Sequence, residues 1–253
     1  MNGLGFDISN NLFVPASATQ DEFFEKNYIA LRTREKRIYS DDELRTLPSV
    51  PTDHPHFKEW TIRKKSCDQF IRYLESKKTI LSILEVGCGN GWLSYQLSRI
   101  PGSKVIAVDI NLTELRQAAR VFDKNSKLKF VYGDIRSGIL QDLKFDIIVF
   151  AASIQYFANL GEILDVALGH LYSDAEIHIL DSNFYKEDEI AGARERTSEY
   201  YESLGFSEMI DYYHHHELAS LASYRYEILQ DPRSVKNKLF GRNPFYWICV
   251  KNR

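Results

Sequence analysis

The sequence is poor in cysteine and contains no long apolar run. Three of its 253 residues are cysteines, at the scattered positions 67, 88 and 249. This odd number and spacing argue against a disulfide framework and a zinc site, so we expect reduced thiols, a cytoplasmic protein and no bound metal. No apolar stretch approaches the roughly 20 residues that a membrane helix needs, and the N-terminus lacks the features of a secretory signal. We therefore expect no membrane partner.

The sequence also lacks a surplus of basic charge. It has 32 lysines and arginines against 35 acidic residues, which gives a formal net charge of -3. Dedicated nucleic-acid binders usually have a basic balance, so no nucleic-acid partner is expected. A hydrophobic content of 44% and a charged content of 26% are typical of a globular protein. The length suffices for one domain with a sizeable core and an appended segment.

What the sequence does contain is a glycine-rich turn directly after an apolar run. In ILEVGCGNG, residues 83–91, an acidic residue precedes three glycines at every second position: Glu85, Gly87, Gly89 and Gly91. Glycines at such a turn let backbone N–H groups approach a ligand closely. Dinucleotide-binding folds use G-x-G-x-x-G, and Trp92 occupies the third glycine position here. The spacing therefore favours a ligand other than a nicotinamide dinucleotide.

Strands and helices alternate along the middle of the chain. Apolar runs predict strands over 81–86, 105–108, 128–132, 145–151 and 176–180, and periodic patterns predict helices over 59–76, 92–99, 111–122 and 159–171. Asn111 and Glu114 have the spacing of a capping box. After a helical insertion over about 187–222, strands over 225–229 and 245–251 follow each other without a helix, which predicts an antiparallel hairpin. The expected fold is a doubly wound, Rossmann-like α/β sheet of seven strands, mostly parallel, with this hairpin at the C-terminus.

The segment before this pattern is interpreted as an appendage. Residues 22–38 have helical composition, and three prolines at positions 48, 51 and 55 then interrupt the chain. We therefore expect an N-terminal helical appendage over 1–58 and a main domain over 59–253. Whether the appendage acts as a lid is left open.

The glycine turn and two later acidic residues together resemble the class I S-adenosylmethionine-dependent methyltransferases. The E-x-G-x-G-x-G turn is similar to motif I of that family, and Asp109 and Asp134 follow the second and third strands in VIAVDIN and FVYGDI. Residues 145–157, FDIIVFAASIQYF, resemble its motif IV, and the terminal hairpin matches its sheet. The resemblance covers about residues 80–180 well and the hairpin more loosely.

This resemblance implies a cofactor and a set of residues that contact it. The cofactor would be S-adenosyl-L-methionine, with Asp109 accepting hydrogen bonds from the ribose, Asp134 accepting one from the adenine amino group, and Ile135 packing on the ring. Small residues such as Ala151 would leave room for the methionine part. The expected contacts are Glu85, Gly87, Cys88, Gly89, Gly91, Asp109, Ile110, Asp134, Ile135, Ala151 and Gln155.

No residue type is obligatory for the chemistry, because a methyl sulfonium is already activated. The protein has to align the reacting atoms, and a base is needed only if the acceptor must lose a proton. Position in the fold suggests four catalytic candidates: Tyr156, Tyr185, His54 and His56. Arg63 could reach the cofactor carboxylate, but a solvated helix face is the favoured interpretation. The histidines at 214–216 resemble a metal tract, but a solvated helix with one histidine turned inward is favoured.

The resemblance implies methyl transfer to an oxygen or nitrogen atom of a small-molecule acceptor. The chain has AASIQYF after its fourth strand, where amino-methylating DNA enzymes have N/D-P-P-Y and cytosine C5 enzymes have Pro-Cys. Three alternatives stay open: a nicotinamide-dependent oxidoreductase, a methyltransferase acting on protein or RNA, and a non-catalytic binding protein. The oligomeric state is also open.

Overall fold

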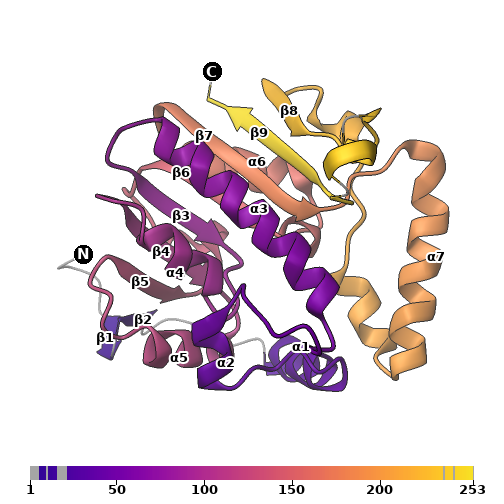
Figure 1. Ribbon diagram of the computed structural model, residues 1–253, viewed down its shortest axis with the longest axis horizontal. Helices are drawn as coiled ribbons and strands as arrows, with labels where there is room; N and C mark the ends of the chain where they lie inside the picture. The colour runs from indigo at the N-terminus through magenta and orange to yellow at the C-terminus, as the bar shows by residue number, and fades with distance from the viewer. Residues whose placement is uncertain (1–5, 10, 16–21, 236, 242, 253) are drawn as a thin grey trace.

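The protein is a nine-stranded sheet covered by helices on both faces (Figure 1). The computed structural model describes residues 6–9, 11–15, 22–235, 237–241 and 243–252. The strand order is β1-β2-β5-β4-β3-β6-β7-β9-β8. The strands are β1 (Phe6–Ser9), β2 (Leu12–Pro15), β3 (Ser82–Val86), β4 (Lys104–Asp109), β5 (Leu128–Tyr132), β6 (Phe145–Ala151), β7 (Leu171–Ser182), β8 (Tyr226–Gln230) and β9 (Tyr246–Lys251).

The direction of the strands confirms the predicted fold class. From β2 to β7 along the sheet, neighbouring strands are parallel, whereas β9 is antiparallel to both β7 and β8. The sequence predicted seven of these strands, and β1 and β2 add two more beside β5. Leu12 pairs with Phe130 and Phe13 with Val131, so part of the expected appendage belongs to the sheet. This apolar run is short and lies close to Asn11 and Pro15, which by themselves indicate a loop.

Helices follow the periodic segments, and side-chain caps fix several of their starts. They are α1 (Glu22–Arg34), α2 (Asp41–Thr46), α3 (Phe57–Ser76), α4 (Trp92–Ser98), α5 (Leu112–Val121), α6 (Leu160–Gly169) and α7 (Glu187–Leu204). Short 3-10 turns span Ile135–Ser137, Ile154–Tyr156, Ser207–Tyr212 and Leu218–Leu221, and a π turn spans Asn237–Gly241. Asn111 and Asn159 accept hydrogen bonds from the backbone N–H three residues later, which caps α5 and α6. Within the described residues, no helix has the length and apolarity to cross a bilayer.

Three apolar clusters hold the layers together. In one cluster, α3, α4 and α5 pack on one face of the sheet through Phe70, Leu97 and Leu115. A second packs α6 on the other face, around Leu164. The third joins α1 to the segment that follows β7, with Phe24, Leu31, Tyr201 and Met209 buried together. In Figure 1 α1 and α7 lie beyond the arrowheads of the central strands, where α/β folds bind ligands.

Candidate functional site

The glycine turn after β3 packs closely against Phe130 of β5 and against Ser153, which follows β6. Gly87, Gly89 and Gly91 have φ angles of 72°, 52° and 73°, in the left-handed region that side chains disfavour. A Cβ on Gly87 would lie 2.5 Å from Ser153 Cβ, and one on Gly91 would lie 2.5 Å from Phe130 Cε1. Glycine at these two positions therefore allows close packing, while the turn's own backbone reaches the sheet edge.

Two buried carboxyl groups hold this turn. Glu85 accepts a hydrogen bond from the Ser94 hydroxyl, which ties the end of β3 to α4. Asp109, at the end of β4, accepts hydrogen bonds from the backbone N–H of Gly89 and of Asn111, both at 2.7 Å. Burial raises the pKa of both carboxyl groups, that of Glu85 to about 8. The protonation state of both carboxyl groups therefore depends on the charge of a ligand that binds beside them.

The raised pKa of Glu85 predicts a pH-dependent stability. Between its usual value near 4.5 and about 8, the folded state keeps a proton that the unfolded state has lost, so the free energy of unfolding should fall as pH rises. Glu85→Gln removes this titration and should lose less stability than the wild type between pH 5.5 and pH 8. Urea unfolding at both pH values measures the difference. An equal loss in the two proteins would contradict the proposed burial of a titrating Glu85.

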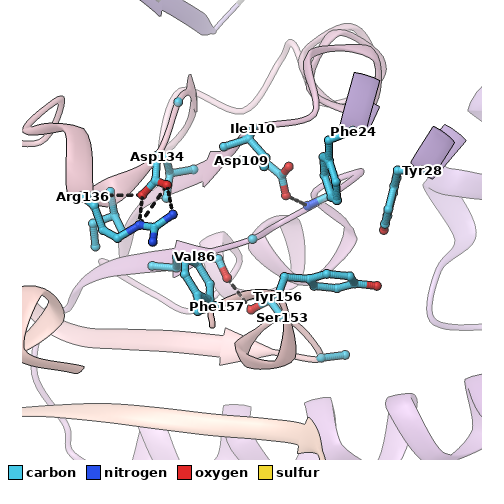
Figure 2. A pocket seen from close by; sticks show the side chains of 16 residues that line it. Phe24, Tyr28, Val86, Asp109, Ile110, Asp134, Arg136, Ser153, Tyr156 and Phe157 are labelled. Atoms are coloured by element: carbon cyan, nitrogen blue, oxygen red, sulfur yellow. Dashed lines mark hydrogen bonds and ion pairs between the residues drawn. The ribbon is translucent and has the colours of Figure 1, made fainter. Parts of the chain in front are cut away.

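Three adjoining compartments lie along the carboxyl ends of the strands. The first, of ≈ 120 Å³, lies beside β4 and β5 and is lined by Asp109, Ile110, Asp134 and Ile135 (Figure 2). The second, also ≈ 120 Å³, lies over the glycine turn and is lined by Glu85, Gly87, Cys88, Gly89, Glu114 and Ala151. The third, of ≈ 720 Å³, lies between α1, α3 and α7. Ala152 lines all three, so they meet directly after β6.

Two of the residues expected to contact the cofactor lie elsewhere. Gly91 lines none of the three compartments, because it faces inward and makes room for Phe130 and α5. Gln155 lines the third compartment, where its amide donates to the Ala152 carbonyl at 2.6 Å and accepts from Ser182 at 3.3 Å. The other nine expected contacts line the first or the second compartment.

Asp134 already has an ionic partner at the edge of the first compartment. Its carboxylate accepts hydrogen bonds from the Arg136 guanidinium and, at 2.8 Å, from the Arg136 backbone N–H (Figure 2). The Arg136 guanidinium also lies 5.6 Å from the centre of the Phe157 ring. A ligand that needs Asp134 as an acceptor must therefore share it with Arg136.

Helix α1 contributes residues that the sequence did not point to. Phe24 and Tyr28 line the first compartment, and Arg32 lines the second and third. Arg32 donates to the Tyr156 hydroxyl oxygen at 2.7 Å. Glu25 holds the helix in place by accepting from the Thr113 backbone N–H at 2.8 Å and from its hydroxyl at 2.6 Å. These contacts span many residues of sequence, so no local pattern could reveal them.

The four catalytic candidates separate into two pairs. Tyr156 and Tyr185 line the third compartment, and burial raises the pKa of Tyr185. His54 and His56 line none of the three compartments. His56 Nε2 lies 2.8 Å from the Glu35 carbonyl oxygen, and His54 stacks on Tyr39, so both histidines hold the connection between α1 and α3. The structure therefore does not bring them to the site.

Two further expectations require correction. Arg63 lines the second and third compartments, where its Nε donates to Glu59 at 2.9 Å, instead of lying on a solvated face. The histidines at 214–216 do not form a helix, although one of them, His216, is buried and contacts the Ile154 carbonyl oxygen at 3.1 Å. The preceding 3-10 turn ends at Tyr212, before the first of these histidines.

One group of possible metal ligands lies among the described residues, away from these compartments. Ligand atoms of Glu176, His178 and Cys249 all lie within 4.8 Å of one another. Lys77 Nζ lies 2.7 Å from the Glu176 carboxylate, and Trp247 donates its indole N–H to His178 Nδ1 at 3.1 Å. An ammonium group and an indole thus already satisfy two of the three side chains, which makes the group a buried hydrogen-bond network.

Comparison with known proteins agrees with this geometry. The model of the methyltransferase domain family matches residues 83–173. A malonyl-[acyl-carrier protein] O-methyltransferase of Acetivibrio thermocellus is 31% identical over 115 residues, 45% of this chain and 40% of that protein. Its counterpart in Bacillus cereus is 30% identical over 122 residues, 45% of this chain and 43% of that protein. The chain therefore spans about two fifths of the length of the curated relatives it matches.

Solved structures share the fold over most of the chain. The plantazolicin methyltransferase BpumL in complex with SAH matches with a TM-score of 0.55 at 19% identity. The match covers 92% of this chain and 97% of the BpumL chain. The magnesium protoporphyrin IX methyltransferase ChlM of Synechocystis PCC 6803, with bound SAH, matches with a TM-score of 0.57 at 13% identity. The match covers 92% of this chain and 100% of the ChlM chain. Residues 83–173 thus match the methyltransferase domain family, and the sheet order agrees with the fold that these methyltransferase structures share.

Proposed function

We propose that this protein transfers the methyl group of S-adenosylmethionine to an oxygen or nitrogen atom of a small-molecule acceptor. The observation that carries the proposal is the meeting of three compartments at Ala152. Two of them form a cradle for a nucleoside and its amino-acid tail, and the third is large enough for an acceptor. Bound S-adenosylmethionine supplies an activated methyl group, and the protein supplies alignment and exclusion of water.

The first two compartments fit the cofactor in chemistry as well as in shape. Asp109 offers a carboxylate for ribose hydroxyls, and Ile110 and Ile135 offer apolar surfaces for the adenine ring. Carboxyl groups over the glycine turn suit the ammonium group of the amino-acid tail, and Arg32, Arg37 and Arg63 around the second compartment suit its carboxylate. Phe24 and Tyr28 of α1 close the first compartment, which supports a role for α1 as a lid.

The third compartment supports a small acceptor. Aromatic side chains line it, namely Tyr156, Tyr185, Tyr200, Tyr201, Tyr213 and Phe245, and a cavity of ≈ 720 Å³ is in the range of small-molecule sites. The names of two structural neighbours refer to the small molecules plantazolicin and magnesium protoporphyrin IX. The curated relatives are named for malonyl-[acyl-carrier protein], in which a protein carries the malonyl group. We assign Tyr156 and Tyr185 to acceptor positioning, with Arg32 holding the Tyr156 hydroxyl in place.

Thermal unfolding tests the cofactor part of this proposal. S-adenosylhomocysteine at 100 times its dissociation constant should stabilise the native state by about 2.7 kcal/mol and raise the melting temperature by several degrees. NAD and NADP, added separately, should cause no shift. A shift with either dinucleotide alone would overturn the proposal in favour of an oxidoreductase.

Methyl transfer then identifies the class of acceptor. The protein is incubated with methyl-labelled S-adenosylmethionine and a cell extract, and the label is followed into the small-molecule, protein and RNA fractions. We expect it in the small-molecule fraction. Label confined to protein or RNA would contradict the small-acceptor assignment and leave the methyltransferase activity in place.

A further inference from the structure

Glu114 of α5 extends over the glycine turn and into the second compartment. Its two carboxylate oxygens lie 3.3 and 3.6 Å from the position that a Cβ on Gly89 would occupy. Glu85, Gly87 and Cys88 line the same compartment. The carboxyl group is thus in contact with the backbone that a cofactor must approach.

The same carboxyl group has no hydrogen-bond partner within the described part of the chain. The sequence predicted a capping box, in which Glu114 would accept from the Asn111 backbone N–H. Asp109 Oδ1 takes that N–H at 2.7 Å instead, and only the other half of the box forms, with the Glu114 N–H donating to Asn111 Oδ1 at 3.0 Å. Competition from Asp109 therefore leaves the Glu114 side chain free to face the compartment.

Several charged or titratable groups act on Glu114 from the elements packed around it. Burial is the largest influence and raises its pKa to about 8; the charges of Asp109 and Glu25 add to this, and that of Arg32 opposes it. Burial raises the pKa of Tyr28 and of Cys88, and the negative charge of Glu114 raises both pKa values further. The raised pKa favours the protonated form of Glu114, and a cation that binds beside it favours loss of the proton.

We propose that Glu114 contacts the bound cofactor and that its carboxylate makes the site favour the cationic sulfonium S-adenosylmethionine over the neutral thioether S-adenosylhomocysteine. The inference rests on the proposed function. Methyl transfer removes one positive charge from the ligand, so the attraction to Glu114 weakens at that step. A carboxylate at this position therefore favours exchange of product for a new cofactor molecule.

Titration calorimetry with both ligands tests this inference. We compare the wild type with Glu114→Gln, which keeps the shape and removes the charge, at pH 8.5, where the carboxyl group ionises readily. The ratio of the dissociation constants for S-adenosylhomocysteine and S-adenosylmethionine should fall by about five- to thirtyfold in the variant, the size expected for one charge pair at a partly buried site. The loss should lie mainly in the affinity for S-adenosylmethionine.

Glu162→Gln is the matched control. Glu162 follows the cap Asn159 of α6 with the same spacing, and its side chain is exposed to solvent, so this variant should keep the wild-type ratio. An unchanged ratio in folded Glu114→Gln, with both ligands bound, overturns the inference and leaves the proposed function standing. Failure of the wild type to bind either ligand overturns both.

A measurement on the wild type keeps the inference testable if the variant does not fold. Calorimetry at pH 7.5 in two buffers with different ionisation enthalpies reports the protons released on binding. S-adenosylmethionine should release more protons than S-adenosylhomocysteine, because its sulfonium adds a positive charge to the ammonium group that both ligands carry. Equal proton release by the two ligands would overturn the inference.

Discussion

Replacing Gly91 with alanine should lower the free energy of unfolding by about 2–5 kcal/mol. The φ angle of 73° costs a residue with a side chain about 1–2 kcal/mol. The new Cβ would also lie 2.5 and 2.9 Å from two ring atoms of Phe130, which is fully buried in β5. Such overpacking adds about 1–3 kcal/mol. Urea unfolding followed by circular dichroism measures the loss.

Gly138→Ala is the control that separates the two contributions. Gly138 has a similar φ angle of 79°, and a Cβ there would meet no atom within 4 Å. This variant should lose only the backbone part, about 1–2 kcal/mol. If both variants lose the same stability, close packing of Phe130 on Gly91 contributes nothing and the assignment of Gly91 to packing is wrong.

The fold was predictable because its evidence is local. Apolar runs of five to seven residues mark β3, β5 and β6, and the predicted bounds of β5 and β6 match the structure. Asp109 and Asp134 could be placed because parallel strands bring their carboxyl ends to the same edge of the sheet. The antiparallel arrangement of β8 and β9 was predicted because the sequence indicates no helix between them; the structure has a π turn there, Asn237–Gly241.

The rest of the site depends on contacts between distant parts of the chain. The sequence marks α1 as a charged, aromatic helix, but its position over the glycine turn depends on the hydrogen bonds from Thr113 to Glu25. Glu114 shows how a correct local rule can fail, because Asp109 competes for the same N–H. His54 and His56, which were predicted as catalytic candidates, do not line the site; His56 contacts the Glu35 carbonyl oxygen instead.

Asp109→Ala should weaken the binding of S-adenosylhomocysteine by about 1–3 kcal/mol, or roughly five- to 150-fold, because charged hydrogen bonds to the ligand are left unmade. The carboxylate also accepts from the Gly89 and Asn111 backbone N–H groups, so its removal loosens the turn that cradles the ligand. Both effects act in the same direction. Titration calorimetry at pH 7.5 measures the affinity, and thermal unfolding without ligand shows whether the variant remains folded.

Asp134→Ala provides the comparison, because the same charge is removed at the other end of the first compartment. The Asp134 carboxylate is already paired with Arg136, so a ligand gains less from it and the loss of affinity should be smaller than for Asp109→Ala. A folded Asp109→Ala variant with wild-type affinity would remove Asp109 from the site. A larger loss for Asp134→Ala would mean that recognition depends more on the base than on the ribose, and that Arg136 moves away from Asp134 when the ligand binds.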